Sequence, residues 1–317
     1  MRNIYSNIFK VNNKNLFIAI NYLKKKELIG VPTETVYGLA GNAYSKESVE
    51  KIYFLKKRPL KNPLIIHYLN LKQLKNDVEL NSDFHKLYKK FCPGPITFVL
   101  LKKKNSLLPS VATGNLKTVA IRVPRNKTVR KILRSLSFPL AIPSANKSSH
   151  VSPVSANDVV SEFGASLKFI LDDGRCAIGL ESTVVDLTSR PRILRPGSIN
   201  PSDISKVLKK KINIYKGSKN IKAPGMLKRH YSPGIPMKLN QKKVKNNEAF
   251  IVFGKKYKKA KNIFNLSNKS NLNEAARNLY RILRLIKKKN YKMICVSSIP
   301  KTGIGLAIND RLSRAAK

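Results

Sequence analysis

The sequence predicts an α/β fold, with one large domain followed by a smaller one. Over residues 1–208, short apolar runs alternate with stretches whose apolar residues repeat at helical spacing. A basic segment with several prolines follows at 209–236, and a second alternation of strand and helix patterns fills 237–317. We therefore expect a large domain at 1–208, a linker at 209–236 and a small C-terminal domain at 237–317.

The helices of the large domain follow from apolar spacing and from capping residues. Apolar residues repeat at helical spacing over 16–23, and Ser45 is a typical N-cap for a helix whose inner face lies within 49–55. Further helices are expected at 84–91, 129–136 and 159–163.

Short apolar runs bounded by turn residues predict the strands of this domain. The first run stops at Pro32, and Pro93-Gly94-Pro95 separates a helix from the strand after it. The expected strands are 28–31, 64–68, 97–101, 119–123, 140–143, 169–171, 183–187 and 192–194. Together they indicate a sheet of seven or more strands.

The small domain alternates strand, helix, strand and helix. Strands are expected at 249–253 and 293–297, and helices at 272–286 and 306–316. This order is typical of a small Rossmann-like α/β unit.

The chain is strongly basic. Among 317 residues there are 63 Lys and Arg but only 17 Asp and Glu, a formal net charge of +46. This balance excludes an acidic-surface protein and predicts non-specific binding of polyanions at low salt. Lysine predominates over arginine, and a genome composition biased toward A and T can produce the same excess of lysine. RNA binding, with or without catalysis, therefore stays an alternative explanation of the charge.

Other classes are disfavoured by what the sequence lacks. Its three cysteines are far apart, so neither a disulfide framework nor a zinc site is indicated. We expect no membrane span, because no apolar stretch reaches about 18 residues. The first ten residues do not read as a secretory signal, so the cytoplasm is the expected location.

Five polar clusters follow apolar strands, where α/β sheets place their sites. They are 32–39, 56–67, 143–152, 181–186 and 192–197. Taken singly, each cluster is also typical of an ordinary turn or a helix end. The usual phosphate-binding glycine motifs are absent from the sequence. Two short segments, at 144–147 and 301–303, match two of the three motifs of penicillin-binding-type serine enzymes, but the third motif does not occur between them.

In their chain order, the motifs are similar to those of the threonylcarbamoyl-AMP synthase family, in its long, two-domain Sua5 form. The matching segments are PTETVYGL (32–39), KKRPLKNPLIIH (56–67), CPGPITFVL (92–100), VAIRVP (119–124), PLAIPSAN (139–146), ESTVVD (181–186), ILRPGSI (193–199), APGMLKRHYSP (223–233) and GIGLAINDRLSRAA (303–316). Two positions depart from the family pattern. Ser149 stands where the family often has glycine, and Leu227-Lys228 replaces a pair that is often aromatic or basic.

The resemblance implies a YrdC-like domain with a twisted mixed sheet and an open concave face, followed by the small Rossmann-like domain. It also implies that the protein makes threonylcarbamoyl-AMP and pyrophosphate from L-threonine, bicarbonate and ATP. Mg²⁺ would sit mainly on the phosphates rather than in a protein cage. The product would pass to the tRNA-modifying threonylcarbamoyltransferase machinery, which forms N6-threonylcarbamoyladenosine in tRNAs that read ANN codons.

The resemblance also implies residue roles. Lys56 and Arg58 would neutralise the charge that develops on the phosphates. The expected ATP contacts are Arg58, Asn62, Thr118, Ser144, Asn146, Ser152, Arg195 and Tyr231. The expected L-threonine contacts are Thr35, His67, Arg122 and Ser182. Without the family context, a core histidine would be the commoner interpretation of His67, and a surface residue on a strand would explain Arg122 about as well as a ligand contact.

Overall fold

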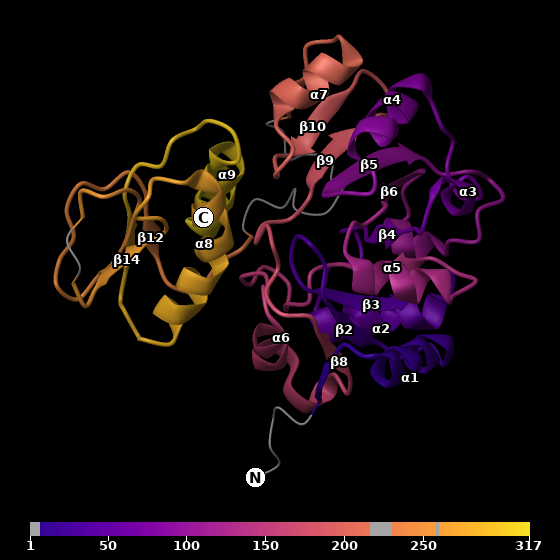
Figure 1. The fold of residues 1–317 in the computed structure, drawn as a ribbon, viewed down its shortest axis with the longest axis horizontal. Helices are drawn as coiled ribbons and strands as arrows, with labels where there is room; N and C mark the ends of the chain where they lie inside the picture. The colour runs from indigo at the N-terminus through magenta and orange to yellow at the C-terminus, as the bar shows by residue number, and fades with distance from the viewer. Residues whose placement is uncertain (1–6, 216–229, 258–259) are drawn as a thin grey trace.

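The computed structural model describes residues 7–215, 230–257 and 260–317. Two separate sheets organise this part of the chain, one of eleven strands and one of four. Figure 1 shows the two domains side by side, with the small domain against one flank of the large one. The predicted α/β class is confirmed.

The larger sheet is mixed and orders its strands β1-β8-β2-β3-β7-β4-β6-β5-β9-β10-β11. Their bounds are β1 Ile8–Lys10, β2 Ile29–Val31, β3 Gly38–Asn42, β4 Ile65–His67, β5 Ile96–Leu101, β6 Thr118–Arg122, β7 Leu140–Ala141, β8 Ile170–Asp172, β9 Thr183–Asp186, β10 Arg192–Arg195 and β11 Asn213–Ile214. Strands distant in sequence are neighbours at its centre. β4 pairs with β6 in parallel, and β5 pairs with β9 in parallel.

Helices cover the two faces of this sheet unequally. Their bounds are α1 Asn13–Lys24, α2 Lys46–Lys56, α3 Leu71–Leu74, α4 Ser82–Phe91, α5 Lys127–Arg134, α6 Ala156–Phe163 and α7 Pro201–Leu208, with short 3-10 turns at Ser110–Thr113 and Gly164–Ser166. Buried residues of α2, α4, α6 and α7 share one core with the sheet, whereas α1 and α5 share another. A smaller cluster packs on β4, β5, β6, β9 and β10, on the side where the polar cavity described below also lies.

The predicted helices and strands of the large domain are present, with bounds that differ from the expected ones by a few residues. Ser45 caps α2 by accepting a hydrogen bond from the amide of Ser48, as the sequence predicted. β3 was not predicted, because its sequence GLAGN lacks the β-branched residues that mark strands. α7 was not predicted either, although Pro201 at its first turn is a favoured start.

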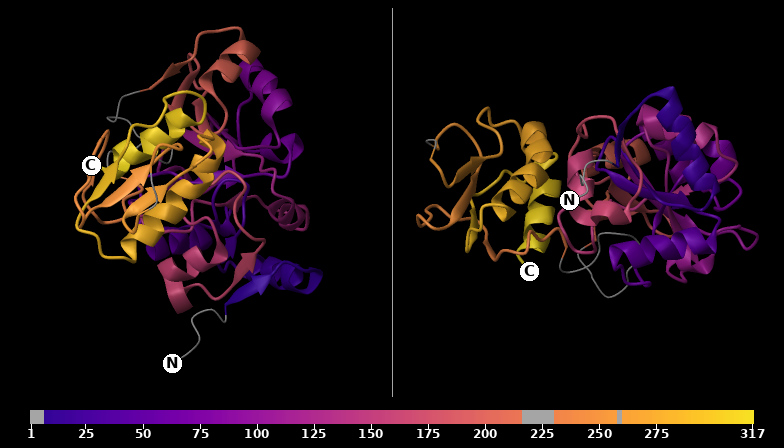
Figure 2. Two further views of the ribbon diagram at one scale, coloured as in Figure 1. Left: turned by 60° about the vertical axis from the view of Figure 1, so that its left-hand side comes forward. Right: turned by 90° about the horizontal axis from the view of Figure 1, so that it is seen from below.

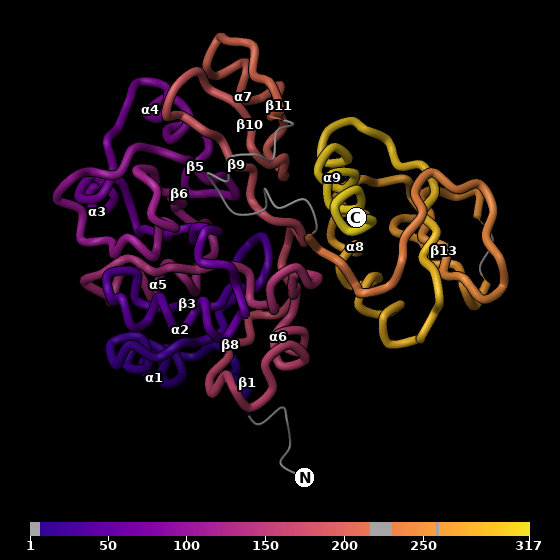
Figure 3. The backbone as a smooth tube through the Cα atoms, turned by 180° about the vertical axis from the view of Figure 1, so that it is seen from behind, coloured from indigo at the N-terminus to yellow at the C-terminus, as the bar shows by residue number. Residues whose placement is uncertain are grey.

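The small domain contains a fully parallel sheet in the order β12-β15-β13-β14. Its elements are β12 Met237–Lys238, β13 Ala249–Val252, β14 Ile263–Asn265, α8 Leu272–Lys287, β15 Ile294–Val296 and α9 Gly305–Ala315. Figures 2 and 3 show that α8 and α9 lie between this sheet and the large domain. The apolar stripe predicted over 272–286 is buried in the core of this domain.

The expected linker is described only in part. β11 pairs with β10, so the large sheet continues into the segment expected to begin at 209. Leu227-Lys228 lies outside the described residues. The domain boundaries at 208 and 236 stay predictions. No helix in the described part of the chain is both long and apolar enough to cross a membrane.

Candidate active site

A polar cavity lies where several strands of the large sheet end. Its volume is about 460 Å³, including space that is open to solvent. Its lining combines cations, hydroxyls and two histidines, and consists of Thr35, Val36, Arg58, Ile65, His67, Arg122, Ile142, Pro143, Ser144, Glu181, Ser182, Arg195, His230 and Tyr231.

Strand register brings two of these side chains together. His67 ends β4, Arg122 ends β6, and the two residues are direct partners in the parallel pairing. Because side chains alternate along a strand, His67 lies on the same face as Ile65, and Arg122 on the same face as Ala120, the pairing partner of Ile65. The parallel ladder therefore places an imidazole beside a guanidinium at one edge of the cavity.

The Arg122 guanidinium is held by the turn that precedes β3. It forms an ion pair with Glu34 at 2.7 Å and donates a hydrogen bond to Oγ1 of Thr35 at 2.9 Å. Oγ1 of Thr35 is also 2.9 Å from Oγ1 of Thr33. Burial alone would raise the pKa of Glu34, but the Arg122 charge and the Arg125 amide lower it to about 2. Glu34 is thus ionised at neutral pH and fixes Arg122.

Both cavity histidines are neutral at physiological pH. Burial and the neighbouring Arg122 lower the pKa of His67 to about 3. Burial also lowers the pKa of His230 to about 3. Among the described residues, Nε2 of His67 and Nδ1 of His230 have no hydrogen-bond partner. Buried polar atoms of this kind are usually satisfied, so these two are available to a ligand.

Arg58 reaches the cavity from the end of α2. Lys57 takes a left-handed conformation, with φ of 48°, which ends the helix and turns the chain toward Arg58. The Arg58 guanidinium donates to the carbonyls of Asn62 at 2.9 Å and Pro63 at 2.8 Å. Burial lowers the pKa of Arg58 to about 10, so the side chain remains a cation at neutral pH.

Lys56 does not line the cavity but supports its wall. It is almost fully buried, and its Nζ donates to the carbonyls of Ser144, at 2.5 Å, and Asn146. Burial and the nearby Arg58 hold the pKa of Lys56 well below its usual range. The contacts therefore fix the loop that presents Ser144.

The opposite wall is formed by the ends of β9 and β10. Oγ of Ser182 lies 2.7 Å from Oγ1 of Thr97. Arg195 donates from Nε to the Ser182 carbonyl and from Nη2 to the Ser182 hydroxyl, both at 3.1 Å. Gly197 is required here, because a Cβ at this position would lie 2.3 Å from the Thr183 amide nitrogen.

Comparisons with known proteins agree with these motifs. A family profile described as telomere recombination, for the Sua5, YciO and YrdC proteins, matches residues 21–197. The profile of the threonylcarbamoyl-AMP synthase C-terminal domain matches residues 199–317. The threonylcarbamoyl-AMP synthase of Pyrococcus abyssi is 36% identical over 97% of this chain and 95% of its own length.

The chain belongs to the threonylcarbamoyl-AMP synthase family. The Bacillus subtilis member is 34% identical over 96% of this chain and 94% of its own length. A crystal structure described as Pyrococcus abyssi Sua5 complexed with L-threonine superposes with a TM-score of 0.90, at 35% identity. That comparison covers 98% of this chain and 97% of the solved one, so the two-domain form of the synthase is shared over its whole length.

The predicted contact residues of the synthase divide into two groups. Those that line the cavity are Thr35, Arg58, His67, Arg122, Ser144, Ser182, Arg195 and Tyr231. Those that the cavity lining does not include are Lys56, Asn62, Thr118, Asn146 and Ser152. Some of this second group have polar atoms without a partner among the described residues, namely both amide atoms of Asn62, Oγ1 of Thr118 and Oδ1 of Asn146.

Two polar residues of the cavity lining, Glu181 and His230, were absent from the predicted contacts of the synthase, as was Glu34, which holds Arg122 from outside the lining. Glu34 lies within the PTETVYGL motif, and its position beside two threonines was a signal for a polar site. Glu181 directly precedes Ser182, but nothing local indicates that its carboxylate is paired with Arg311, which lies 130 positions later. His230 adjoins the predicted Tyr231, with ring centroids 3.9 Å apart.

Proposed function

We propose that this cavity couples L-threonine, bicarbonate and ATP to threonylcarbamoyl-AMP, releasing pyrophosphate. The observation that carries the proposal is the convergence of Arg58, Arg122 and Arg195 with hydroxyl and imidazole groups on one pocket. The substrates bring a carboxylate, a carbonate and a triphosphate into the same space. Three buried guanidinium groups supply the charge and the planar donors that such anions require.

The threonine side of the cavity is proposed at Thr35, His67, Arg122 and Ser182. Arg122 is pre-oriented by Glu34, so its remaining donors can hold the amino-acid carboxylate without a rearrangement. His67 is neutral, and its unpaired Nε2 suits the threonine hydroxyl rather than a charged group.

The nucleotide side is proposed at Arg58, Ser144, Arg195 and Tyr231. Asn62, Thr118, Asn146 and Ser152 are proposed to join it when ATP is bound. Lys56 contributes by holding the loop that carries Ser144. Its ammonium group is then a positioning element in the unliganded pocket, and a phosphate oxygen would compete with the loop carbonyls for it.

We propose that Mg²⁺ enters with ATP and is held by phosphates and water. Glu34 and Glu181, the two carboxylates that reach this region, are already paired with Arg122 and Arg311. No group of three or more His, Cys, Asp or Glu side chains suited to a metal occurs in the described part of the chain. The residues present therefore do not form a protein cage for the ion.

The proposed chemistry has two steps. The threonine amine attacks the bicarbonate carbon, a carbamate forms, and water leaves. A carbamate oxygen then attacks the α-phosphorus, and the bond to the β-phosphate oxygen breaks, which releases pyrophosphate. Arg58 and Arg195 stabilise the negative charge that moves onto the leaving oxygens. Burial of the reacting groups against the cavity walls would keep water from the labile mixed anhydride.

The direct test is incubation of the purified chain with ATP, Mg²⁺, L-threonine and bicarbonate, followed by mass spectrometry. We expect threonylcarbamoyl-AMP and one pyrophosphate per product, dependent on all three substrates. The alternative, a basic RNA-binding protein without catalysis, predicts no adenylate and no exchange of pyrophosphate into ATP. Transfer of the product to tRNA is proposed to need separate threonylcarbamoyltransferase proteins, which a reconstituted modification assay would show.

A further inference from the structure

A buried polar cluster joins the C-terminal domain to the cavity wall. At its centre is Glu181, which precedes β9 and lines the cavity. Its carboxylate accepts hydrogen bonds from Oγ of Ser152 at 2.5 Å and from the hydroxyl of Tyr280, on α8, at 2.9 and 3.0 Å. Nε of Arg311, on α9, donates to the same carboxylate at 2.8 Å. Two residues of the small domain thus bind one acid of the large domain.

Arg311 contacts more of the site than this one acid. Its Nη2 donates to the carbonyl of Pro196 at 3.0 Å, and its Nη1 pairs with Asp310 at 2.6 Å. Its guanidinium also stacks over the ring of Tyr231, 5.0 Å from the centroid. A single fully buried guanidinium therefore ties together the segments that carry Ser182, Arg195 and Tyr231.

Burial gives this contact its strength. The side chain of Arg311 is fully buried and that of Glu181 is 7% exposed. Burial alone would raise the pKa of Glu181, but the Arg311 and Arg195 charges and the Ser152 hydroxyl lower it to about 2. The acid is therefore ionised, and the hydrogen bonds from its three donors, Ser152, Tyr280 and Arg311, are charge-assisted.

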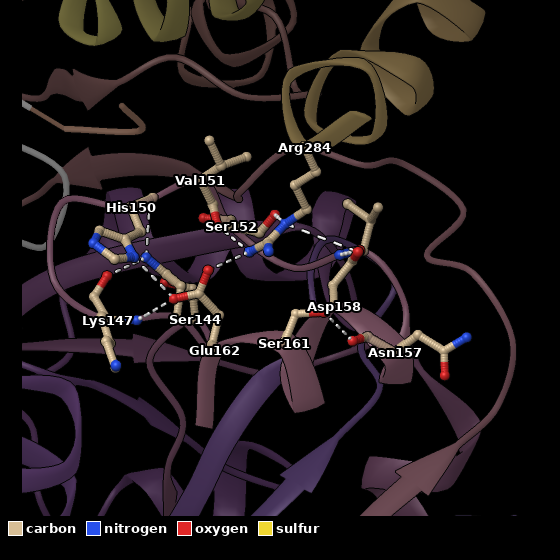
Figure 4. A network of polar contacts seen from close by, with 12 residues as sticks. Ser144, Lys147, His150, Val151, Ser152, Asn157, Asp158, Ser161, Glu162 and Arg284 are labelled. Atoms are coloured by element: carbon tan, nitrogen blue, oxygen red, sulfur yellow. Dashed lines mark hydrogen bonds and ion pairs between the residues drawn. The ribbon is translucent and has the colours of Figure 1, made fainter. Parts of the chain in front are cut away.

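A second contact from α8 holds the loop that carries Ser152. Figure 4 shows Arg284 reaching across to the segment that carries His150, Val151 and Ser152. Its guanidinium donates to the carbonyl of Val151 and pairs with Glu162 at 3.0 Å. The Ser152 hydroxyl thus donates to Glu181, which the small domain holds. The carbonyl of the neighbouring Val151 accepts a hydrogen bond directly from Arg284 of the small domain.

We propose that Arg311 and Tyr280 are positioning residues of the synthase. From the C-terminal domain they fix Glu181 and, through Arg311, the Pro196 carbonyl, and so hold Ser152 and the end of β10 in the arrangement that binds the nucleotide. The inference rests on the function proposed above, and it gives the small domain a direct role in ATP affinity. Threonine affinity depends less on it, because Arg122, Thr35 and His67 are held within the large domain, and the fourth proposed threonine contact, Ser182, is also bonded there to Thr97.

The test compares Tyr280→Phe and Arg311→Lys with matched controls in the same domain. Tyr291→Phe removes an exposed hydroxyl that donates to the Lys261 carbonyl, and Arg281→Lys alters a side chain bonded to Asn278 of its own helix. ATP affinity is measured by calorimetry, KM and kcat by product formation, and folding by thermal melting. Lysine keeps the charge of Arg311 but loses its planar fork.

We expect each test variant to weaken ATP binding and raise the KM for ATP about tenfold, the effect of losing one hydrogen bond to a charged group. The KM for threonine should change by less than about threefold, and both controls should match the wild-type chain. Tyr280→Phe keeps the buried ring, so it remains informative if Arg311→Lys does not fold.

Two results would overturn the inference. One is a Tyr280→Phe chain that binds ATP as the wild type does. The other is an equal loss for ATP and threonine that follows the fall in melting temperature, as a purely structural role requires. A wild-type chain that binds ATP but forms no adenylate would contradict the proposed function instead, and ATP affinity of the variants would still decide the inference. A wild-type chain that does not bind ATP would overturn both.

Discussion

Replacement of Arg122 by methionine separates the stabilising role of the buried pair from its role in binding. The variant leaves Glu34 without its cation, in a place where the two side chains are only 5% and 9% exposed. Removing one partner of a buried ion pair costs about 3–5 kcal/mol. The fall of the Glu34 pKa from 4.5 to about 2 corresponds to about 3 kcal/mol, which agrees.

Denaturant unfolding at pH 7 measures this loss for the single variant and for Arg122→Met combined with Glu34→Gln. The double variant removes both charges, so it should recover most of the free energy of unfolding. Neither variant should bind L-threonine in calorimetry, since the carboxylate partner is missing in both. A loss below about 1 kcal/mol in the single variant, or a double variant no more stable than the single one, would refute the energetic argument. Threonine binding by the folded double variant would refute the assigned role.

The pH dependence of this pair has a defined sign. The pKa of Glu34 is lower in the folded chain than its usual value of 4.5, so the unfolded chain binds the proton more tightly. The stabilisation is complete above about pH 4.5 and declines as the pH falls toward 2. The single Arg122→Met variant should therefore lose less stability than the wild type between pH 6 and pH 3.

Three further predictions concern single positions. Arg58→Ala should fold but bind ATP at least about tenfold more weakly, because a buried cation on the nucleotide side is lost. Calorimetry and adenylate formation measure this, and near-normal product formation would contradict it. Ser149 has φ of 68° where the family often has glycine, so Ser149→Gly should raise the free energy of unfolding by about 0.5–1 kcal/mol, and a destabilised variant would show that the left-handed backbone carries no strain there. His67 and His230 should keep constant imidazole NMR shifts between pH 8 and pH 5, since burial lowers both pKa values to about 3; titration of either resonance in that range would exclude the neutral assignment.

The sequence predicted those parts of the fold whose cause is local. Ser45 caps α2 by bonding the amide of Ser48, three positions along the chain. The buried apolar residues of α8 recur at helical spacing within that one helix. β3 was missed because its glycines serve close packing: a Cβ at Gly38 would lie 2.1 Å from Cγ2 of Ile142 on the neighbouring segment. That requirement arises from pairing with a distant part of the chain, and no local pattern carries it.

The same division applies to the site. His67 and Arg122 could be named from motifs, but their direct pairing depends on β4 and β6 being neighbours, with residues 68–117 between them in sequence. The role of Lys56 as a support for the Ser144 loop depends on contacts 88 and 90 positions away. Motif resemblance therefore proposed the residues, whereas tertiary contacts determine which of them line the cavity and which hold its walls.

The cavity draws its lining from positions as far apart as Thr35 and Tyr231, in a chain of 317 residues. During synthesis on the ribosome, the pocket is therefore incomplete until most of the polypeptide has emerged. Neither L-threonine nor ATP can therefore guide the folding of the early nascent chain. The large sheet must reach its topology on its own packing energy, and any folding assistance from substrate comes only after translation is nearly finished.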